Sequence, residues 1–349
     1  MTGRRSINQA TTISSRLRSP LVSLIVPVYN EEAAIGLFMA QVNAMVRRSD
    51  THFELVFVND GSSDNTLSVI KAFPSSCPMR LVDLSRNFGK EAAMTAGLAM
   101  SKGDAAVPID VDLQDPIEVI DQFIVEWKNG HDMVYGVRES RGCDTPMKRN
   151  TSVLFYYIFN KLSRDKIPEN VGDFRLMDRK VIDAVLSLEE KNRFMKGMFS
   201  WVGFKTKAVP YHRAPRAAGN TSWNYWKLWN FALDGVIGFS SLPLRVWTYI
   251  GAFISLFSFL FIANIVFRKL VFGNPVDGWS SLMVTVLFFG GIQLISLGII
   301  GEYLGRLFIE SKNRPVYLVD TVEEFEAHAE NVDEAEATEF SRRSCRETA

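Results

Sequence analysis

The stretch AAVPIDVDLQDP, residues 105–116, places two carboxylates directly after a short apolar run. Such a run predicts a buried strand over Ala105–Ile109. Asp110 and Asp112 are two residues apart, so in an extended chain their side chains share one face, together with Gln114. Oxygen ligands of this kind suit Mg²⁺ or Mn²⁺ bound to diphosphate oxygens. The stretch therefore predicts a metal and diphosphate site at a strand end, and ordinary acidic turn residues are the alternative.

Asp115 has a simpler interpretation than the two carboxylates before it. It precedes Pro116, and Glu118 follows at the third position of an expected helix. Aspartate before proline at a helix start is typical of an N-cap. We therefore predict that Asp115 caps this helix.

Strand and helix patterns alternate from residue 20 to residue 136. This alternation predicts an α/β domain with a mostly parallel sheet, whose ligands bind beyond the carboxyl ends of the strands. The expected strands are Leu21–Val28, Phe53–Asn59, Met79–Leu84, Ala105–Ile109 and Asp132–Tyr135. The expected helices are Glu31–Arg47, Asn65–Phe73, Lys90–Met100 and Ile117–Lys128, followed by Met147–Leu162, Arg179–Leu188 and Arg193–Val202 in a less regular second half.

Polar residues follow the expected strands at the edge where a ligand would bind. Tyr29 can stack on a base, Asp60 can accept hydrogen bonds from a base or form a turn, and Asn30 can cap the next helix. Neither G-x-G-x-x-G nor G-x-x-x-x-G-K occurs in the chain. A dinucleotide site of the Rossmann type and a P-loop are therefore disfavoured.

The composition limits the classes of partner and compartment. Lys plus Arg and Asp plus Glu both number 39, so the formal net charge is zero and nothing favours nucleic acid. The three cysteines, Cys77, Cys143 and Cys345, are widely spaced, which predicts a reducing compartment without a disulfide framework or a zinc site. The N-terminus lacks the apolar core of a secretory signal. We predict disorder for the basic residues 1–19 and for the acidic tail from Asp320 to Glu339.

Two apolar segments, Val246–Phe267 and Ser281–Gly301, are each long enough to cross a bilayer. A buried pair of core helices is the alternative. The link between them, Arg268–Ser280, carries two basic residues, whereas the flanking chain on the other side carries more. By the positive-inside rule, we expect an integral protein of the inner membrane whose main domain lies in the cytoplasm.

Three tryptophans at helical spacing, Trp223, Trp226 and Trp229, precede the first apolar segment. They predict an amphipathic helix in the membrane interface, or else a tryptophan-rich core helix. The expected organisation is a disordered N-terminus (1–19), an α/β catalytic domain (20–212), an interfacial segment (213–245), a transmembrane hairpin (246–303) and a C-terminal segment with an acidic disordered tail (304–349).

A group of cations follows the last regular strand. It comprises Arg138, Arg141, Lys148 and Arg149, and Arg175 lies further along in GDFRL, residues 172–176. Arginines can hold a phosphate bidentately, and a solvated basic loop is the alternative. Asp173, the acid among them, is a candidate general base or a partner of Arg175.

Seven short motifs follow one another along the chain. They are VPVYNE (26–31), VNDGSSD (58–64), SRNFGKE (85–91), DVDLQDP (110–116), YGVR (135–138), GDFRL (172–176) and FSSLPLR (239–245). In this order they resemble the inverting family 2 glycosyltransferases of GT-A fold. Residues 20–318 are similar to bacterial polyprenyl-phosphate glycosyltransferases, the group of bactoprenol glucosyltransferases and relatives of dolichol-phosphate mannose synthase.

The resemblance implies a role for each matching residue. Around the nucleotide-sugar donor it implies Pro27, Tyr29, Glu31, Asp60, Lys90 and Asp110. At a Mg²⁺ or Mn²⁺ ion it implies Asp110, Asp112 and Gln114, with Asp112 also serving catalysis. At the acceptor phosphate it implies Arg138, Arg141 and Arg175, with Asp173 as the candidate base.

One residue departs from the family pattern. Relatives commonly have a lysine before the aromatic residue of the stretch that reads GNTSW here (219–223), and this chain has Ser222 at that position. If that lysine binds phosphate, another cation must replace it.

The implied reaction is transfer of a hexose, in the first place glucose from UDP-glucose, to undecaprenyl phosphate. A mannose synthase that uses GDP-mannose and a catalytically dead membrane scaffold are the alternatives. A processive polysaccharide synthase is disfavoured, because its Gln-x-x-Arg-Trp stretch is missing. Homo-oligomers are left open.

Overall fold

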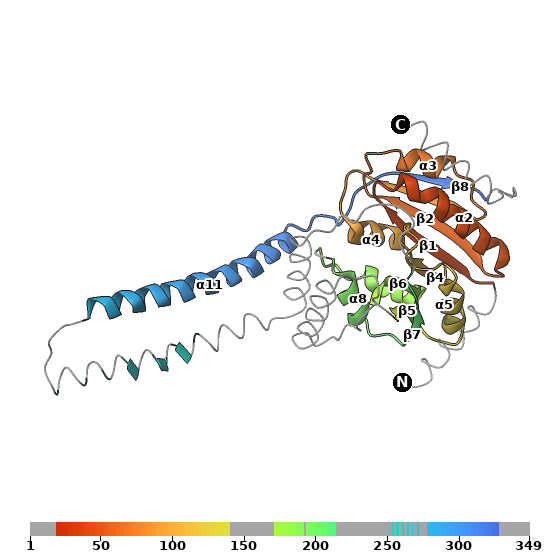
Figure 1. Ribbon diagram of the computed structural model, residues 1–349. Helices are drawn as coiled ribbons and strands as arrows, with labels where there is room; N and C mark the ends of the chain where they lie inside the picture. Colours follow the sequence, from red (N-terminus) through yellow and green to blue (C-terminus); the bar gives the residue numbers. More distant parts are fainter. Residues whose placement is uncertain are drawn as a thin grey trace.

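The computed structural model describes residues 19–139, 171–191, 193–213 and 278–327, with isolated positions between 251 and 271. These residues form an α/β domain with a long helix extending from it (Figure 1). The strands are β1 (Leu21–Val28), β2 (His52–Asn59), β3 (Met79–Leu84), β4 (Ala105–Pro108), β5 (Met133–Arg138), β6 (Val171–Asp178), β7 (Thr206–Tyr211) and β8 (Val319–Phe325). The helices are α2 (Glu32–Arg48), α3 (Thr66–Ala72), α4 (Lys90–Met100), α5 (Val119–Lys128), α7 (Arg179–Leu186), α8 (Met195–Trp201) and α11 (Trp279–Ser311).

One eight-stranded sheet runs in the order β7-β5-β6-β4-β1-β2-β3-β8. Its central strands β4, β1, β2 and β3 are parallel, which confirms the expected parallel sheet for this part of the domain. Strand β6 is antiparallel to both β4 and β5, and β8 is antiparallel to β3. The carboxyl ends of β1 and β4 therefore meet the beginning of β6, where Asp173 lies.

Helices cover both faces of the sheet with separate apolar cores. One core joins α2, α3 and α5 to the sheet through large side chains such as Phe38, Phe57 and Trp127. The other joins α4, α7 and α8 through side chains such as Met94 and Phe199. Since α4 and α8 lie on the same face, residues at their beginnings can meet above β6.

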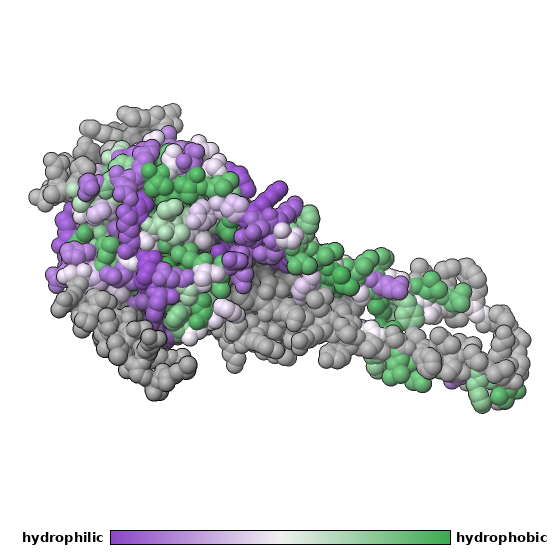
Figure 2. All heavy atoms as spheres, turned by 180° about the vertical axis from the view of Figure 1, so that it is seen from behind, coloured by the Kyte–Doolittle hydropathy of each residue, from purple (hydrophilic) through white to green (hydrophobic). Residues whose placement is uncertain are grey.

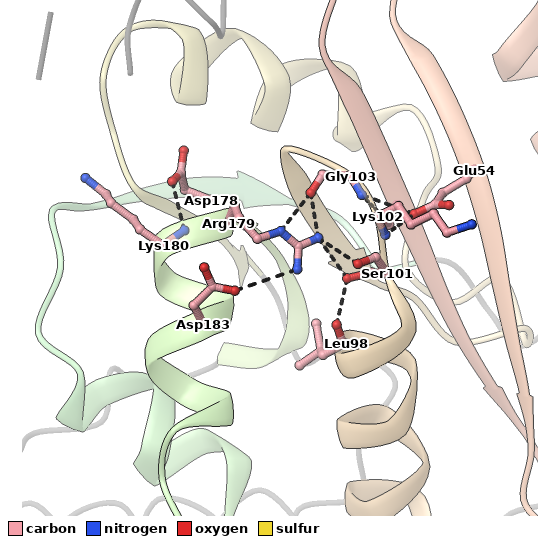
Figure 3. Close-up of polar contacts among 10 residues, drawn as sticks. Glu54, Leu98, Ser101, Lys102, Gly103, Asp178, Arg179, Lys180 and Asp183 are labelled. Atoms are coloured by element: carbon pink, nitrogen blue, oxygen red, sulfur yellow. Dashed lines mark hydrogen bonds and ion pairs between the residues drawn. The ribbon is translucent and has the colours of Figure 1, made fainter. Parts of the chain in front are cut away.

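A polar cluster around Gly103 fixes the beginning of β4 (Figure 3). The other end of β4 leads to Asp110. Arg179 Nε donates to the Gly103 carbonyl at 2.9 Å, and its Nη2 donates to the Ser101 carbonyl at 3.0 Å. Glu54 Oε1 accepts from the backbone N–H of Lys102 at 2.6 Å and of Gly103 at 3.1 Å. The cluster therefore ties α4, β4 and α7 together at the edge opposite the candidate site.

The apolar helix α11 extends away from the domain (Figures 1 and 2). Within the described residues, one helical segment is long and apolar enough to cross a membrane, Phe288–Ser311, and none of it is buried. It overlaps the predicted span Ser281–Gly301 and extends ten residues beyond it. Most of the other predicted span, Val246–Phe267, and of the predicted interfacial segment, 213–245, lies outside the described residues.

The predicted disorder of the acidic tail is wrong for its first residues, because β8 continues the sheet there. Six residue pairs join β8 to β3 in antiparallel register, from Met79 with Phe325 to Leu84 with Val319. Its acids pair with bases of the domain: Glu323 lies 2.6 Å from Lys71, and Glu324 lies 2.9 Å from Arg80. The acidic character that suggested disorder is thus complementary to a basic sheet edge.

Candidate active site

A small pocket lies where β1, β4, β6 and the beginning of α4 meet. Four of the predicted site residues line it together, although they are far apart in sequence. Its lining residues are Pro27, Lys90, Met94, Pro108, Asp110, Asp115, Asp173 and Phe174. The structure thus brings donor-site and base candidates to one place.

Lys90 lines this pocket and contacts two of its carboxylates. Helix α4 begins at Lys90 directly after Gly89, which has a φ of 96°. The ammonium of Lys90 donates to Asp110 Oδ2 at 2.7 Å and lies 3.3 Å from Asp173 Oδ2. Burial alone would lower the pKa of Lys90, but the two carboxylates raise it above its ordinary value. Lys90 is therefore a fixed cation between them.

Asp173 is held ionised by the cations around it. Burial alone would raise the pKa of Asp173, but Lys90, Lys196 and Arg175 outweigh burial and lower this pKa to about 2. A carboxylate with so low a pKa is a weak proton acceptor at neutral pH. The surrounding cations therefore favour the charged form of Asp173, and its role as a general base stays a prediction.

Asp110 and Asp112 are not on one extended strand, contrary to the sequence expectation. Strand β4 ends at Pro108, Val111 and Asp112 form a turn, and Leu113 has a φ of 56°. Asp110 faces the pocket, whereas Asp112 is 7% exposed and its Oδ1 accepts from the backbone N–H of Gln114 at 3.2 Å. The role of Gln114 as a metal ligand stays a prediction.

The residues of this turn fit a divalent cation in one respect. The Lys90 ammonium lies 2.6 Å from Asp110 Oδ1, so this carboxylate already faces a positive charge inside the pocket. Within the described residues, no three His, Cys, Asp or Glu side chains converge on one point. Asp110, which faces the pocket, is therefore the carboxylate that fits a divalent cation, and the contribution of Asp112 stays a prediction.

Asp60 anchors the loop that leads to Lys90. It is 3% exposed, and its carboxylate oxygens accept from the backbone N–H groups of Phe88 at 2.7 Å and Gly89 at 2.9 Å. Gly61, with a φ of 67°, allows this loop to approach closely, because a Cβ there would lie 2.6 Å from Arg86 C. A contact between Asp60 and the nucleotide base of a donor stays a prediction, since both carboxylate oxygens of Asp60 already accept hydrogen bonds.

The loop after β1 is fixed by residues that follow β2. Asn30 Oδ1 accepts from the backbone N–H of Ser63 at 2.8 Å, so Asn30 does not cap α2 as expected. The backbone N–H of Glu31 donates to Thr66 Oγ1 at 2.9 Å. Tyr29 is 48% exposed beside these contacts, and its ring is free to stack on a planar ligand.

The predicted N-cap role of Asp115 is wrong. Helix α5 begins at Val119, and Asp115 instead accepts a hydrogen bond from the Tyr211 hydroxyl at 2.5 Å. Arg138 donates to the same hydroxyl at 3.2 Å and lies 3.9 Å from Asp115. Strand β7, which carries Tyr211, was not predicted, so the sequence could not supply this partner.

The predicted acceptor-phosphate arginines do not form one cluster in the described residues. Arg138 contacts Asp115 and Tyr211, whereas Arg175 donates to the Gly172 carbonyl at 2.7 Å and stacks 4.0 Å from the Phe199 ring. Arg141 lies outside the described residues. Arg175 and Asp173 are two residues apart on β6, so their side chains lie on the same face of the sheet, the face covered by α8. Arg138 does not lie on this face.

Two residues near Asp173 were missed by sequence reasoning. Lys196, the single charged residue of α8, is close enough to lower the pKa of Asp173. Glu91 follows Lys90 in α4, and burial, together with Asp173, raises the pKa of Glu91 to about 8. A lone charge in an apolar helix was the signal for Lys196, because such residues are seldom buried without a partner.

Comparison with known proteins defines the class that this fold and pocket belong to. Residues 23–186 match glycosyl transferase family 2, and residues 242–307 match the GtrB C-terminal hairpin. The chain belongs to glycosyl transferase family 2 and is a glycosyltransferase, as the sequence resemblance predicted.

Particular relatives cover most of the chain. The bactoprenol glucosyl transferase of Shigella phage SfV is 52% identical over 299 residues, which are 85% of this chain and 97% of that protein. The prophage bactoprenol glucosyl transferase homolog of Escherichia coli K12 is 50% identical over 302 residues, which are 86% of this chain and 99% of the relative.

Proposed function

We propose that this enzyme transfers glucose from UDP-glucose to undecaprenyl phosphate with inversion at the anomeric carbon. The observation that carries the proposal is the pocket in which Lys90, Asp110 and Asp173 meet at the ends of β1 and β4. The relatives that are named bactoprenol glucosyl transferases support glucose over mannose as the sugar.

In this reaction an oxygen of the lipid phosphate attacks the anomeric carbon, the bond from that carbon to the diphosphate breaks, and UDP leaves. A phosphate monoester has a second pKa near ~6, so at neutral pH it is largely a dianion and needs no general base. The low pKa of Asp173 agrees with this. Asp173 then serves to hold Lys90 in place, and the Lys90 ammonium offsets charge on the donor.

A divalent cation belongs to the proposal through Asp110 and Asp112, which would hold it. When bound, the cation supplies positive charge for the departing diphosphate. In this proposal the nucleotide base lies beside Tyr29 and Pro27. The loop that Asp60 anchors borders the same site next to Lys90.

The acceptor is a lipid, so the site must face a membrane. The apolar helix α11 is exposed along Phe288–Ser311 and leads directly back to the domain through β8. We propose that α11 crosses the inner membrane and that the catalytic domain is cytoplasmic, as the distribution of basic residues favours.

The test measures transfer of radiolabelled sugar from UDP-glucose, UDP-galactose and GDP-mannose to undecaprenyl phosphate in detergent with Mg²⁺ or Mn²⁺. Lipid-extractable label from UDP-glucose, abolished by EDTA and by Asp110→Asn, is expected. Label from GDP-mannose alone would assign the enzyme to mannose transfer. Folded protein that labels no lipid from any donor would overturn the proposal and favour the scaffold.

A further inference from the structure

The ammonium of Lys90 lies against both oxygens of the Asp110 carboxylate. It is 2.6 Å from Oδ1 and 2.7 Å from Oδ2. A cation that a carboxylate chelates lies between its two oxygens, so the ammonium takes the position that a chelated divalent cation would need. Lys90 and a divalent cation therefore cannot both contact Asp110 in this way.

Lys90 has a second carboxylate within reach. Asp173 Oδ2 lies 3.3 Å from the same ammonium. Asp173 Oδ1 is buried and accepts no hydrogen bond from any residue that the structure describes. The Lys90 side chain is 42% exposed, and a lysine ammonium is a point charge on a flexible stem. The ammonium can therefore leave Asp110 and keep Asp173 as its partner.

The charges around Lys90 decide when this move is favourable. Asp110, Asp173 and Lys90 together carry one negative charge. A divalent cation on Asp110 would place two more positive charges beside the ammonium, and like charges oppose each other strongly in a pocket that is partly shielded from water. A nucleotide diphosphate brings negative charges that offset this opposition. A cation that arrives with the diphosphate is therefore favoured over a cation that arrives alone.

We propose that Lys90 competes with the divalent cation for Asp110, and that it leaves this carboxylate when the cation comes together with the diphosphate of the donor. Asp173 then keeps the ammonium in the pocket, where it offsets charge on the diphosphate. The inference rests on the proposed function for the identity of the donor. It adds an order of binding, in which the cation and the nucleotide enter together.

The test measures Mn²⁺ binding to the full-length protein in detergent without nucleotide, by electron paramagnetic resonance of the free ion. An adjacent unit charge changes the affinity of a carboxylate for a proton by about 10- to 1000-fold, so Lys90→Met should bind Mn²⁺ at least about tenfold more tightly than the wild type. Lys90→Arg keeps the positive charge, so its Kd for Mn²⁺ should stay within about threefold of the wild type.

Two other lysines are matched controls. Lys207 is exposed on β7 and does not line the pocket, so Lys207→Met should bind Mn²⁺ as the wild type does. Lys196 acts on Asp173 through its charge but forms no ion pair with Asp110 within the described residues. Lys196→Met should therefore tighten Mn²⁺ binding less than Lys90→Met does. Equal tightening in these two variants would overturn the inference, because it indicates a general effect of positive charge.

An Mn²⁺ affinity that is unchanged or weaker in folded Lys90→Met also overturns the inference. Lys90→Gln is equally neutral and takes its place if Lys90→Met does not fold. If the wild type transfers no sugar, the proposed function fails separately, because Mn²⁺ binding is measured without transfer.

The affinity for UDP, measured with and without Mn²⁺, tests the order of binding. Coupling between two ligands is reciprocal, so Mn²⁺ should strengthen UDP binding more in the wild type than in Lys90→Met, which has no ammonium to displace. An equal gain in the two proteins would overturn this order.

Discussion

Asp173 is the residue whose role the structure sharpens most. A general base predicts that Asp173→Asn loses about 10²- to 10⁴-fold in kcat. The low pKa of Asp173 and its contact with Lys90 predict a smaller loss of about tenfold, because the amide still fills the space but no longer balances the cations. Steady-state transfer assays on the folded variant would measure this loss, and a loss of about a hundredfold or more would indicate that Asp173 is a general base.

Glu91 predicts a pH dependence of stability. Burial, followed by Asp173, raises its pKa from 4.5 to about 8 despite the nearby lysines. The folded state therefore binds the Glu91 proton more tightly than the unfolded state does, and stability falls as pH rises from about 4.5 towards 8. Glu91→Gln mimics the protonated form, so its Tm relative to the wild type should increase across this range. Thermal unfolding at several pH values would measure the difference, and parallel curves would refute the prediction.

The sequence indicated which residues line the candidate pocket better than it indicated which residues contact each other. Pro27, Lys90, Asp110 and Asp173 do share a pocket, because their motifs fall at converging chain ends. The cap role of Asp115 was wrong, since its partner Tyr211 comes from a strand with no clear signal. Lys196 was missed for a similar reason: its neighbours belong to other elements of the fold.

Strand β8 is the element with the most direct stability consequence. It covers the edge of β3 and supplies Glu324 to Arg80, whose side chain is 8% exposed. Removing residues 319–349 should lower the Tm by about 5 °C or more, since it opens a sheet edge and leaves a nearly buried charge with one partner fewer. Removing only residues 328–349, which follow β8, is the control and should leave the Tm within about 1 °C. Equal Tm values for the two truncations would show that β8 contributes little.

The sequence predicted the regular elements of the first half within a few residues at each end. Lys90–Met100 and Met79–Leu84 agree with the structure at both ends. Strands β6, β7 and β8 were not predicted, because each lacks the usual alternation. Strand β6 is buried on both faces yet contains Asp173 and Arg175, and β7 contains Pro210, which an edge strand tolerates.

At the scale of the whole molecule, β8 constrains how the chain crosses a membrane. The chain leaves the domain after β7 and returns to the same sheet in β8, so any membrane crossings between these strands must be even in number. If α11 crosses once, a second crossing must lie between residues 214 and 278, where the apolar segment Val246–Phe267 was predicted. The match of residues 242–307 to the GtrB C-terminal hairpin agrees with this arrangement.

Cysteine labelling of intact spheroplasts tests this topology. Asn274→Cys, in the link between the two apolar segments, should react with an impermeant maleimide from outside. Glu326→Cys, just after β8, should react only after permeabilisation. Labelling of both positions from outside, or of neither, would contradict an even number of crossings with a cytoplasmic domain.

The position of β8 in the sheet also sets an order of events during synthesis. Strand β3 is made early, but its partner β8 leaves the ribosome only after the apolar segments have been translated. At about 5–20 residues per second, the β3 edge waits on the order of tens of seconds. Until then it is an unpaired edge that other chains can join. Completion of the catalytic sheet is therefore delayed until the apolar segments have been made, and a chain that stops before β8 should aggregate through this open edge.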